Sequence, residues 1–250
     1  MKLCGRCVSK IGVAPASSPM TQHNPQLNIM KIMRDTHNFH VHIGGRSVAG
    51  PDDAAVAEWA ARLLYQTAMH ETALYASTGT HWRENGSYAR SIKAQKNAAD
   101  RVRRAPKPRK PEVLRDAIYG MGRYHALNLT NLFSHKPTAE FRAFAGTVEA
   151  TKMLGHIQMA LALAERATET TKMDWDALAS ERTYQVRGKG LRELNRFFYL
   201  AGWTLGRRDV GKPQVEMAGW IADLAELKAV KRELKRLARK WDSTTREGAA

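Results

Sequence analysis

Two histidines stand two residues apart in NFHVHIGG (38–45), and this spacing places two side chains capable of metal or acid–base chemistry together. Apolar residues alternate with them, and alternation predicts a strand in which residues i and i+2 share a face. His40 and His42 would then present two neutral nitrogens side by side, as in metal sites and in sites that handle phosphate. A strand whose polar face is merely solvated or hydrogen-bonded is the other interpretation that these residues allow.

A carboxylate and a guanidinium show the same spacing in TAEFRAFAGT (138–147). Glu140 and Arg142 would share one face of a strand, and Phe141 would lie on the other. The preceding stretch, HALNLTNLF (125–133), also alternates, and the turn signal SHKP between the two stretches predicts a hairpin. A surface ion pair is the commoner reason for such a Glu-x-Arg spacing. A sheet with one apolar face and a second face carrying Glu, Arg and two His nevertheless suggests a site.

Helices must cover the apolar face of such a sheet, and apolar residues at helical spacing predict them at 52–77 and 148–167. The first begins with a proline and two acids, which suit a helix N-terminus. A short helix is predicted at 114–121, whereas 81–93 and the basic, proline-containing 101–112 are predicted loops. The double glycine at 44–45 is predicted to form a turn. The predicted fold class is α+β, with a mostly antiparallel sheet and packed helices.

Three regions are expected along the chain. Residues 1–34 contain no Asp or Glu and are predicted to be a loosely ordered basic segment. Residues 35–170 would form the α+β domain. Residues 171–250 would form a basic helical extension with helices at 191–203 and 214–241, the second lying outside the sheet domain as a packing or oligomerisation helix.

The formal net charge of +16 implies an anionic partner, which could be nucleotide phosphate, nucleic acid or an acidic surface. No run approaches the roughly 18 apolar residues of a membrane span, and residues 1–34 lack the apolar core of a signal peptide. We therefore expect no membrane partner and a cytoplasmic location. Cys4 and Cys7 form one isolated CxxC, which is half of a zinc site or a redox pair.

Four segments in order, FHVHIGG (39–45), RENGSYAR (83–90), RYHALNL (123–129) and TAEFRAFAGT, resemble the motifs of the glutamine synthetase-like amidoligases. These carboxylate–amine ligases are frequent in phages and mobile elements. The resemblance covers about residues 36–168 and includes the helix that carries Glu71. It implies that ATP and Mg²⁺ activate a carboxylate as an acyl-phosphate, which an amine then attacks. The substrates would be small molecules, peptides or protein side chains.

The resemblance also implies a role for each matched residue. The metal ligands would be His40 and Glu140, the nucleotide contacts His42, Arg83, Asn85 and Arg123, and the catalytic residues Glu140, Arg142 and Arg90. Arg offers phosphate a bidentate fork, and Mg²⁺ prefers oxygen ligands. Phosphoryl transfer needs charge stabilisation more than covalent help, which suits this residue set.

One part of the family pattern is missing from the sequence. Members of the family begin with a strand that carries a Glu-x-Glu-like pair of metal ligands, and residues 1–34 contain no acid. We therefore expect this strand to be absent and the chain alone to turn over slowly or not at all. A complementary N-terminal half or a second copy of the chain is a candidate partner.

Two other classes of function compete. The His-x-His pair also resembles the first metal strand of amidohydrolase-type hydrolases, but their barrels need further ligands and a strand–helix alternation that this sequence lacks. A nucleic-acid-binding phage protein is the second, motivated by the net charge and by basic clusters at 101–110 and 228–240. No zinc-finger, RNA-recognition or helix-turn-helix motif accompanies those clusters, so nucleic acid is the less favoured partner.

Overall fold

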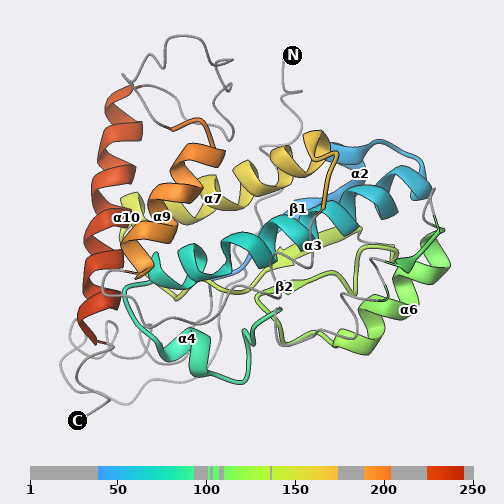
Figure 1. Cartoon of the computed structure of the whole chain (residues 1–250), viewed down its shortest axis with the longest axis horizontal. Helices are drawn as coiled ribbons and strands as arrows, with labels where there is room; N and C mark the ends of the chain where they lie inside the picture. Colours follow the sequence, from blue (N-terminus) through green and yellow to red (C-terminus); the bar gives the residue numbers. More distant parts are fainter. Residues whose placement is uncertain are drawn as a thin grey trace, which may run out of the picture.

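The computed structural model describes residues 39–92, 101, 104–106, 110–135, 137–173, 189–203 and 224–244. The elements in chain order are β1 (Val41–Gly44), α2 (Gly45–Ala49), α3 (Asp53–Ala76), α4 (Trp82–Asn85), α6 (Pro111–Met121), β2 (Leu127–Asn128), β3 (Thr138–Phe141), α7 (Ala150–Glu169), α9 (Lys189–Leu200) and α10 (Leu224–Thr244) (Figure 1). This mostly helical α+β arrangement confirms the predicted fold class. Residues 1–38, including the segment without acids, lie outside the described residues.

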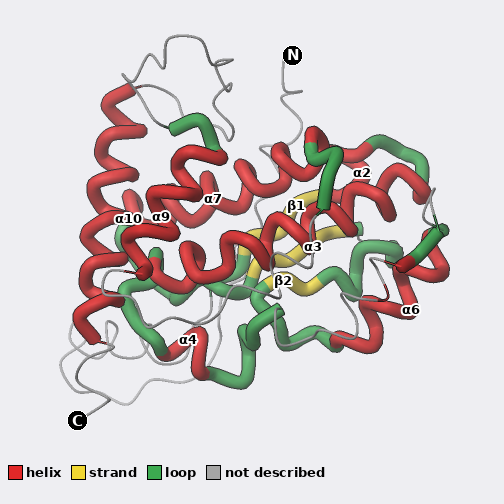
Figure 2. Tube along the Cα trace, in the orientation of Figure 1, coloured by secondary structure: helices red, strands yellow, loops and turns green. Residues whose placement is uncertain are grey.

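A small antiparallel sheet lies under α3 and α7, with the strand order β1-β3-β2 (Figure 2). Val41 pairs with Phe141, and His42 pairs with Glu140. On the other side of β3, Asn128 also pairs with Glu140. The apolar residues of β1 and β3 are buried, as the alternation predicts. Directly opposed residues on neighbouring strands lie close together, so this register brings three polar side chains into one row.

The strands are shorter than predicted. The predicted strand at 125–132 is reduced to β2, because Asn128 accepts hydrogen bonds from both the backbone N and the Oγ1 of Thr130, at 3.0 and 2.8 Å. An Asn side chain that binds the backbone two residues ahead forms a turn in competition with the sheet. β3 likewise ends at Phe141, before the predicted limit at 144, whereas the antiparallel pairing of β2 with β3 agrees with the predicted hairpin.

The two long helices agree with their predicted limits within about two residues. Asp52 caps α3 by accepting hydrogen bonds from the backbone N of Ala54 and Ala55, each at 3.2 Å. α3 and α7 pack against each other, and the indole Nε1 of Trp59 donates to the carbonyl of Ala164 at 2.9 Å. The helices are thus fixed to one another as well as to the sheet.

Three predicted loop regions contain helix instead. Gly45 begins α2 directly after β1, where the prediction had a turn; a Cβ on Gly45 would approach Leu132 Cδ1 to 2.6 Å. The predicted loop at 81–93 contains the one-turn helix α4. Within the basic segment, Pro111 starts α6 three residues before the predicted helix, because proline lacks the N–H that a first helical residue does not need.

The C-terminal helices pack on the helices that cover the sheet. α9 contacts α3, and α10 contacts α9, α7 and α3, crossing the ends of α3 and α7 (Figure 1). One hydrophobic core runs from Val41 in β1 to Trp241 in α10. Residues 214–223 of the predicted last helix lie outside the described residues. The domain boundary at residue 170 remains a prediction, but the packing across it is continuous.

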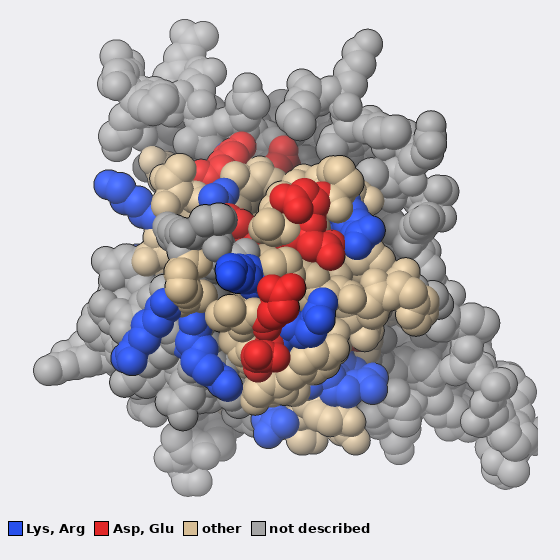
Figure 3. Space-filling model, turned by 90° about the vertical axis from the view of Figure 1, so that its right-hand side faces the viewer, with Lys and Arg blue, Asp and Glu red and all other residues tan. Residues whose placement is uncertain are grey.

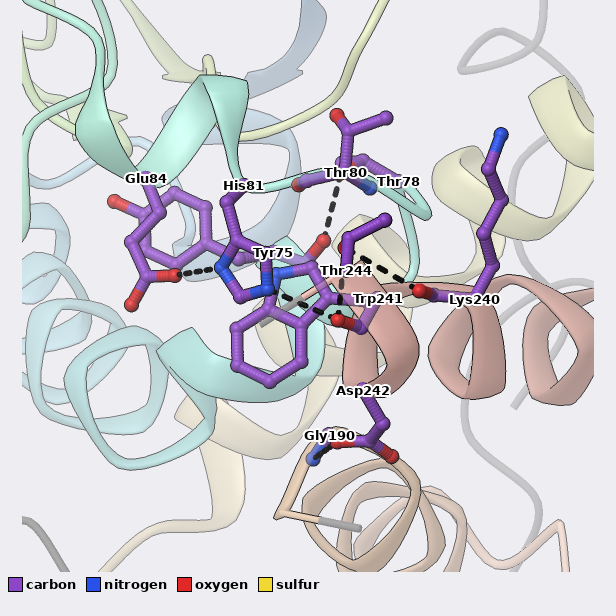
Figure 4. A network of polar contacts seen from close by, with 10 residues as sticks. All are labelled: Tyr75, Thr78, Thr80, His81, Glu84, Gly190, Lys240, Trp241, Asp242 and Thr244. Atoms are coloured by element: carbon purple, nitrogen blue, oxygen red, sulfur yellow. Dashed lines mark hydrogen bonds and ion pairs between the residues drawn. The ribbon is translucent and has the colours of Figure 1, made fainter. Parts of the chain in front are cut away.

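The last turn of α10 is joined to the segment between α3 and α4 around His81 (Figure 4). The His81 ring lies against Trp241 with centroids 4.0 Å apart and the ring planes tilted by 34°, and its Nε2 lies 2.9 Å from the Trp241 carbonyl oxygen. Its Nδ1 lies 3.1 Å from a carboxylate oxygen of Glu84 in α4. α10 therefore supports the element that carries Arg83.

No helix among the described residues is both long and apolar enough to cross a membrane. On the face at the α2 and α6 end, acidic and basic side chains lie side by side (Figure 3). On the part of this face that the structure describes, the excess positive charge is therefore interrupted by acids.

Candidate functional site

The carboxylate of Glu140 lies at the centre of the predicted residues. Its Oε1 is 2.7 Å from Nδ1 of His40, 3.9 Å from Nε2 of His42 and 3.3 Å from Nε of Arg142. Its Oε2 accepts a hydrogen bond from Nδ2 of Asn128 at 2.7 Å. The four polar groups converge on one side chain that is 9% exposed.

The sheet register explains this convergence. His42 and Asn128 flank Glu140 because β3 lies between β1 and β2. His40 lies two residues before His42 and therefore on the same face. Asn128 is oriented by the turn that follows β2: its Oδ1 accepts from Thr130, so its amide nitrogen points at Glu140.

The surroundings of Glu140 stabilise its ionised form. Burial raises the pKa of the Glu140 carboxyl, but hydrogen bonds from His40 and Asn128 and the charge of Arg142 outweigh burial and lower the pKa to about 2. Burial lowers the pKa of His42, and the attraction of Glu140 opposes that effect only in part. Near neutral pH the cluster therefore combines a carboxylate with a His42 imidazole that has a free lone pair.

His40, His42 and Glu140 can each offer one ligand atom, and these three atoms lie within 4.8 Å of one another. Among the described residues they form the one group of at least three His, Cys, Asp or Glu side chains with this property. Two imidazole nitrogens and one carboxylate oxygen fit a divalent cation. His42, which the sequence interpretation placed near the phosphates, thus lies among the candidate ligands.

Arg142 is held from two sides. Its Nη1 donates to the carbonyl oxygen of Arg123 at 2.6 Å, and its Nε forms an ion pair with Glu140. The guanidinium lies over the ring of Tyr124, 5.7 Å from its centroid, and that of Arg123 lies 5.8 Å from the same ring. Arg123 and Tyr124 are exposed, so this edge of the cluster is open to solvent.

Arg83 lies inside the protein rather than at the open edge. It is 3% exposed, and its Nε and Nη2 donate to the carbonyl oxygen of Phe144 at 3.0 and 2.8 Å. Burial and the nearby charge of Arg142 lower its pKa to about 10. Arg83 thus ties α4 to the segment after β3, and its predicted contact with a nucleotide remains a prediction.

The backbone of Arg90 pairs with the segment that precedes β2. Its N–H donates to the carbonyl of Tyr124, and its own carbonyl accepts from Ala126, both at 2.9 Å, while its side chain is exposed. The segment is also fixed by Glu71 of α3, which accepts from Ser91 Oγ and Ile92 N, both at 2.6 Å. Asn85 is the last residue of α4.

Two residues that hold the site in place, Asn128 and Glu71, were not assigned a role from the sequence. Asn128 alternates with two leucines in the predicted strand, so the same period that selected Glu140 could have selected it. Glu71 is an acid on a buried part of α3, and a buried carboxylate requires partners. The identity of those partners depends on the tertiary fold.

Residues 26–164, more than half of the chain, match the model of a family described as "Putative amidoligase enzyme". The chain belongs to this amidoligase family. The matched segment contains β1, β2 and β3 together with His40 and Arg142, and therefore the four residues described above around Glu140. No curated protein and no solved structure matches the chain.

Membership of the amidoligase family supports a ligase-type function. An amidohydrolase of the barrel type would need parallel strands, whereas the described sheet of this amidoligase is antiparallel. Nucleic-acid binding is not favoured either. α9 and α10 lie beyond the matched segment, although they share its core.

Proposed function

We propose that this amidoligase joins a carboxylate to an amine by using ATP and Mg²⁺, with an acyl-phosphate as the intermediate. The observation that carries the proposal is the Glu140 carboxylate, flanked by His40, His42 and Arg142 within a segment that matches the family. Transfer of a phosphoryl group to a carboxylate needs fixed positive charge beside the reacting oxygens, and Arg142 next to Glu140 supports this reaction.

The position of each arginine around Glu140 suggests its role in the proposed reaction. Arg142 is fixed by the Arg123 carbonyl and by Glu140, so its guanidinium would stabilise the charge of the acyl-phosphate without reorganising. The guanidinium of Arg123 lies over the same Tyr124 ring as that of Arg142, and Arg90 is tied to this segment by its backbone. Both side chains are exposed and would attract the polyphosphate. Mg²⁺ bound to the phosphate oxygens would neutralise part of their charge. The amine would then form the new C–N bond as the C–O bond to phosphate breaks.

The test is amide formation by the purified chain with ATP, Mg²⁺ and a panel of carboxylates and amines. Because residues 1–34 contain no acid to form the family's acidic metal-binding strand, we expect slow turnover at most. The ADP and phosphate that do appear should be in a one-to-one ratio with amide, and only when both substrates are present. Arg142→Lys should lower kcat by roughly 10²-fold, because Lys cannot reproduce the planar fork. His135→Ala, at an exposed position, is the matched control. Amide hydrolysis without ATP, or no nucleotide dependence with any pair, would contradict the proposal.

A further inference from the structure

The donor atoms around Glu140 do not suit the ion that the family resemblance implies. Mg²⁺ prefers an all-oxygen octahedron and is usually held by carboxylates, water and substrate phosphates. The cluster offers a single carboxylate and two imidazoles. Imidazole nitrogen favours Zn²⁺, Co²⁺ and similar transition-metal ions, whose affinity for nitrogen donors far exceeds that of Mg²⁺.

We propose that His40, His42 and Glu140 bind a divalent transition-metal ion of the Zn²⁺ or Co²⁺ class, separate from the Mg²⁺ that accompanies the nucleotide. This metal site lies within the proposed ligase site, so any role of its ion in ligation rests on the proposed function. The binding of the ion rests on the donor set alone.

The distances are compatible with such an ion. Two ligands of a tetrahedral ion at about 2.0–2.1 Å from the metal lie about 3.3 Å apart. The His40 Nδ1 to Glu140 Oε1 distance is 2.7 Å, and the His42 Nε2 to Glu140 Oε1 distance is 3.9 Å. The two distances lie on either side of the required value, so small side-chain rotations bring the three donors into place.

Metal binding would replace the hydrogen bond that His40 Nδ1 donates to Glu140 Oε1, and the remaining contacts of the cluster would stay in place. The second oxygen of Glu140 is held by Asn128, which fixes the plane of the carboxylate while Oε1 faces the histidines. Such outer hydrogen bonds orient metal ligands in known sites. The Nε2 atom of His40 is buried and has no hydrogen-bond partner, so hydrogen bonding within the cluster is incomplete.

The coordination number also indicates how the site would function. Three protein ligands leave at least one position for water or a substrate oxygen, which is the pattern of catalytic rather than structural zinc sites. Arg142 lies 3.3 Å from the same Oε1, so an oxygen bound at the open position would be close to both an ion and a guanidinium. An anionic oxygen, such as that of the substrate carboxylate, would be favoured there.

The experiment is a titration of the nucleotide-free chain with Co²⁺, followed by visible absorption, and then competition with Zn²⁺ or a large excess of Mg²⁺. Cys4 and Cys7 are replaced by Ser in every sample, because thiolates bind the same ions. We expect one Co²⁺ per chain, displaced by Zn²⁺ but not by Mg²⁺. His42→Ala should weaken binding by more than the 10–100-fold typical of losing an outer-shell partner.

Two further variants separate the outcomes. Glu140→Gln should also weaken Co²⁺ binding, whereas His135→Ala should leave it unchanged because this exposed side chain is outside the cluster. His42→Gln replaces His42→Ala if circular dichroism shows that the latter is unfolded. Effective competition by Mg²⁺, or unchanged affinity in both His42 variants, would overturn the inference. ATP-dependent amide formation without a Co²⁺ site refutes this inference alone, and a Co²⁺ site without amide formation refutes the ligase proposal alone.

Discussion

Buried ionisable residues determine how the protein responds to pH at the scale of single residues. Glu140 keeps a low pKa because its hydrogen bonds and Arg142 outweigh its burial. His156 in α7 shows the opposite balance. It is fully buried, its ring stacks on Phe144 with centroids 4.5 Å apart, and its Nε2 lies 3.2 Å from the Ser77 carbonyl oxygen. Burial lowers its pKa to about 3, so it is a neutral core residue.

His156 should make the protein less stable in mild acid. Its pKa is 6.5 in the unfolded chain and about 3 in the folded one, so the unfolded chain takes up the proton first as pH falls. Its stabilising contribution is complete above pH 6.5 and is lost between pH 6.5 and 3. His156→Phe keeps the ring stack and removes the titration. Between pH 7 and 5, the wild type should lose about 2 kcal/mol more free energy of unfolding than this variant.

Urea unfolding at the two pH values measures this difference. His135→Ala, at an exposed histidine, should retain the pH dependence of the wild type. Equal losses in the wild type and in His156→Phe would show that His156 is not held neutral.

At the scale of elements, a side chain of α10 accepts hydrogen bonds from the first backbone N–H groups of the neighbouring helix α9. The carboxylate of Asp242 in α10 accepts a hydrogen bond from the backbone N of Gly190 at 2.8 Å (Figure 4). It accepts a second from the backbone N of Leu191 at 3.1 Å, and both donors lie at the start of α9. These N–H groups belong to the first turn, which has no partner within its own helix. A negative charge also suits the positive end of a helix dipole. α9 is thus fixed at its start by α10.

Asp242→Ala should lower the free energy of unfolding by about 1–2 kcal/mol, because it leaves two part-buried N–H groups without their acceptor. Asp242→Asn, which keeps one acceptor oxygen, should lose less. Chemical denaturation of each variant measures the effect. Ser243→Ala, at the exposed next position, is the control and should remain within about 0.5 kcal/mol of the wild type. A loss no larger than that of the control would show that the cap is not formed in solution.

At the scale of the whole molecule, the amidoligase segment depends on helices that the family match does not include. α10 packs closely on α7, where a Cβ on Gly155 would lie 3.0 Å from Leu234, and on the turn after α3, where a Cβ on Gly79 would lie 3.0 Å from Leu237. Phe197, Trp203 and Trp241 are buried in the same core as the sheet. Their removal would expose the apolar surfaces of α3 and α7 to water.

A chain that ends at residue 173 should therefore lose cooperative thermal unfolding and bind an apolar dye such as ANS. The full chain should unfold cooperatively and should not bind the dye. Circular dichroism against temperature and ANS fluorescence measure this outcome. A truncated chain with an unchanged cooperative transition would show that residues 171–250 form an independent unit.

The sequence by itself determined the features that depend on local periodicity. The two-residue period of His40 and His42, and that of Glu140 and Arg142, defined the polar sides of β1 and β3. The apolar spacing and the capping residue Asp52 defined α3. These features follow from nearby residues, because side-chain direction within a strand or helix is set by the backbone of that element.

Only the tertiary structure decided which elements meet. The position of β3 between β1 and β2 brought Asn128 to Glu140. Arg83 and Arg90 are both arginines of the predicted loop at 81–93, and the sequence does not distinguish them. In the structure, the carbonyl of Phe144 holds Arg83 inside the protein, whereas the Arg90 side chain is exposed. α10 shares one core with the sheet, whereas its sequence pattern predicted a helix outside the sheet domain. Pairing between distant segments is selected by the burial and hydrogen bonding of the whole chain, and no local pattern encodes that sum.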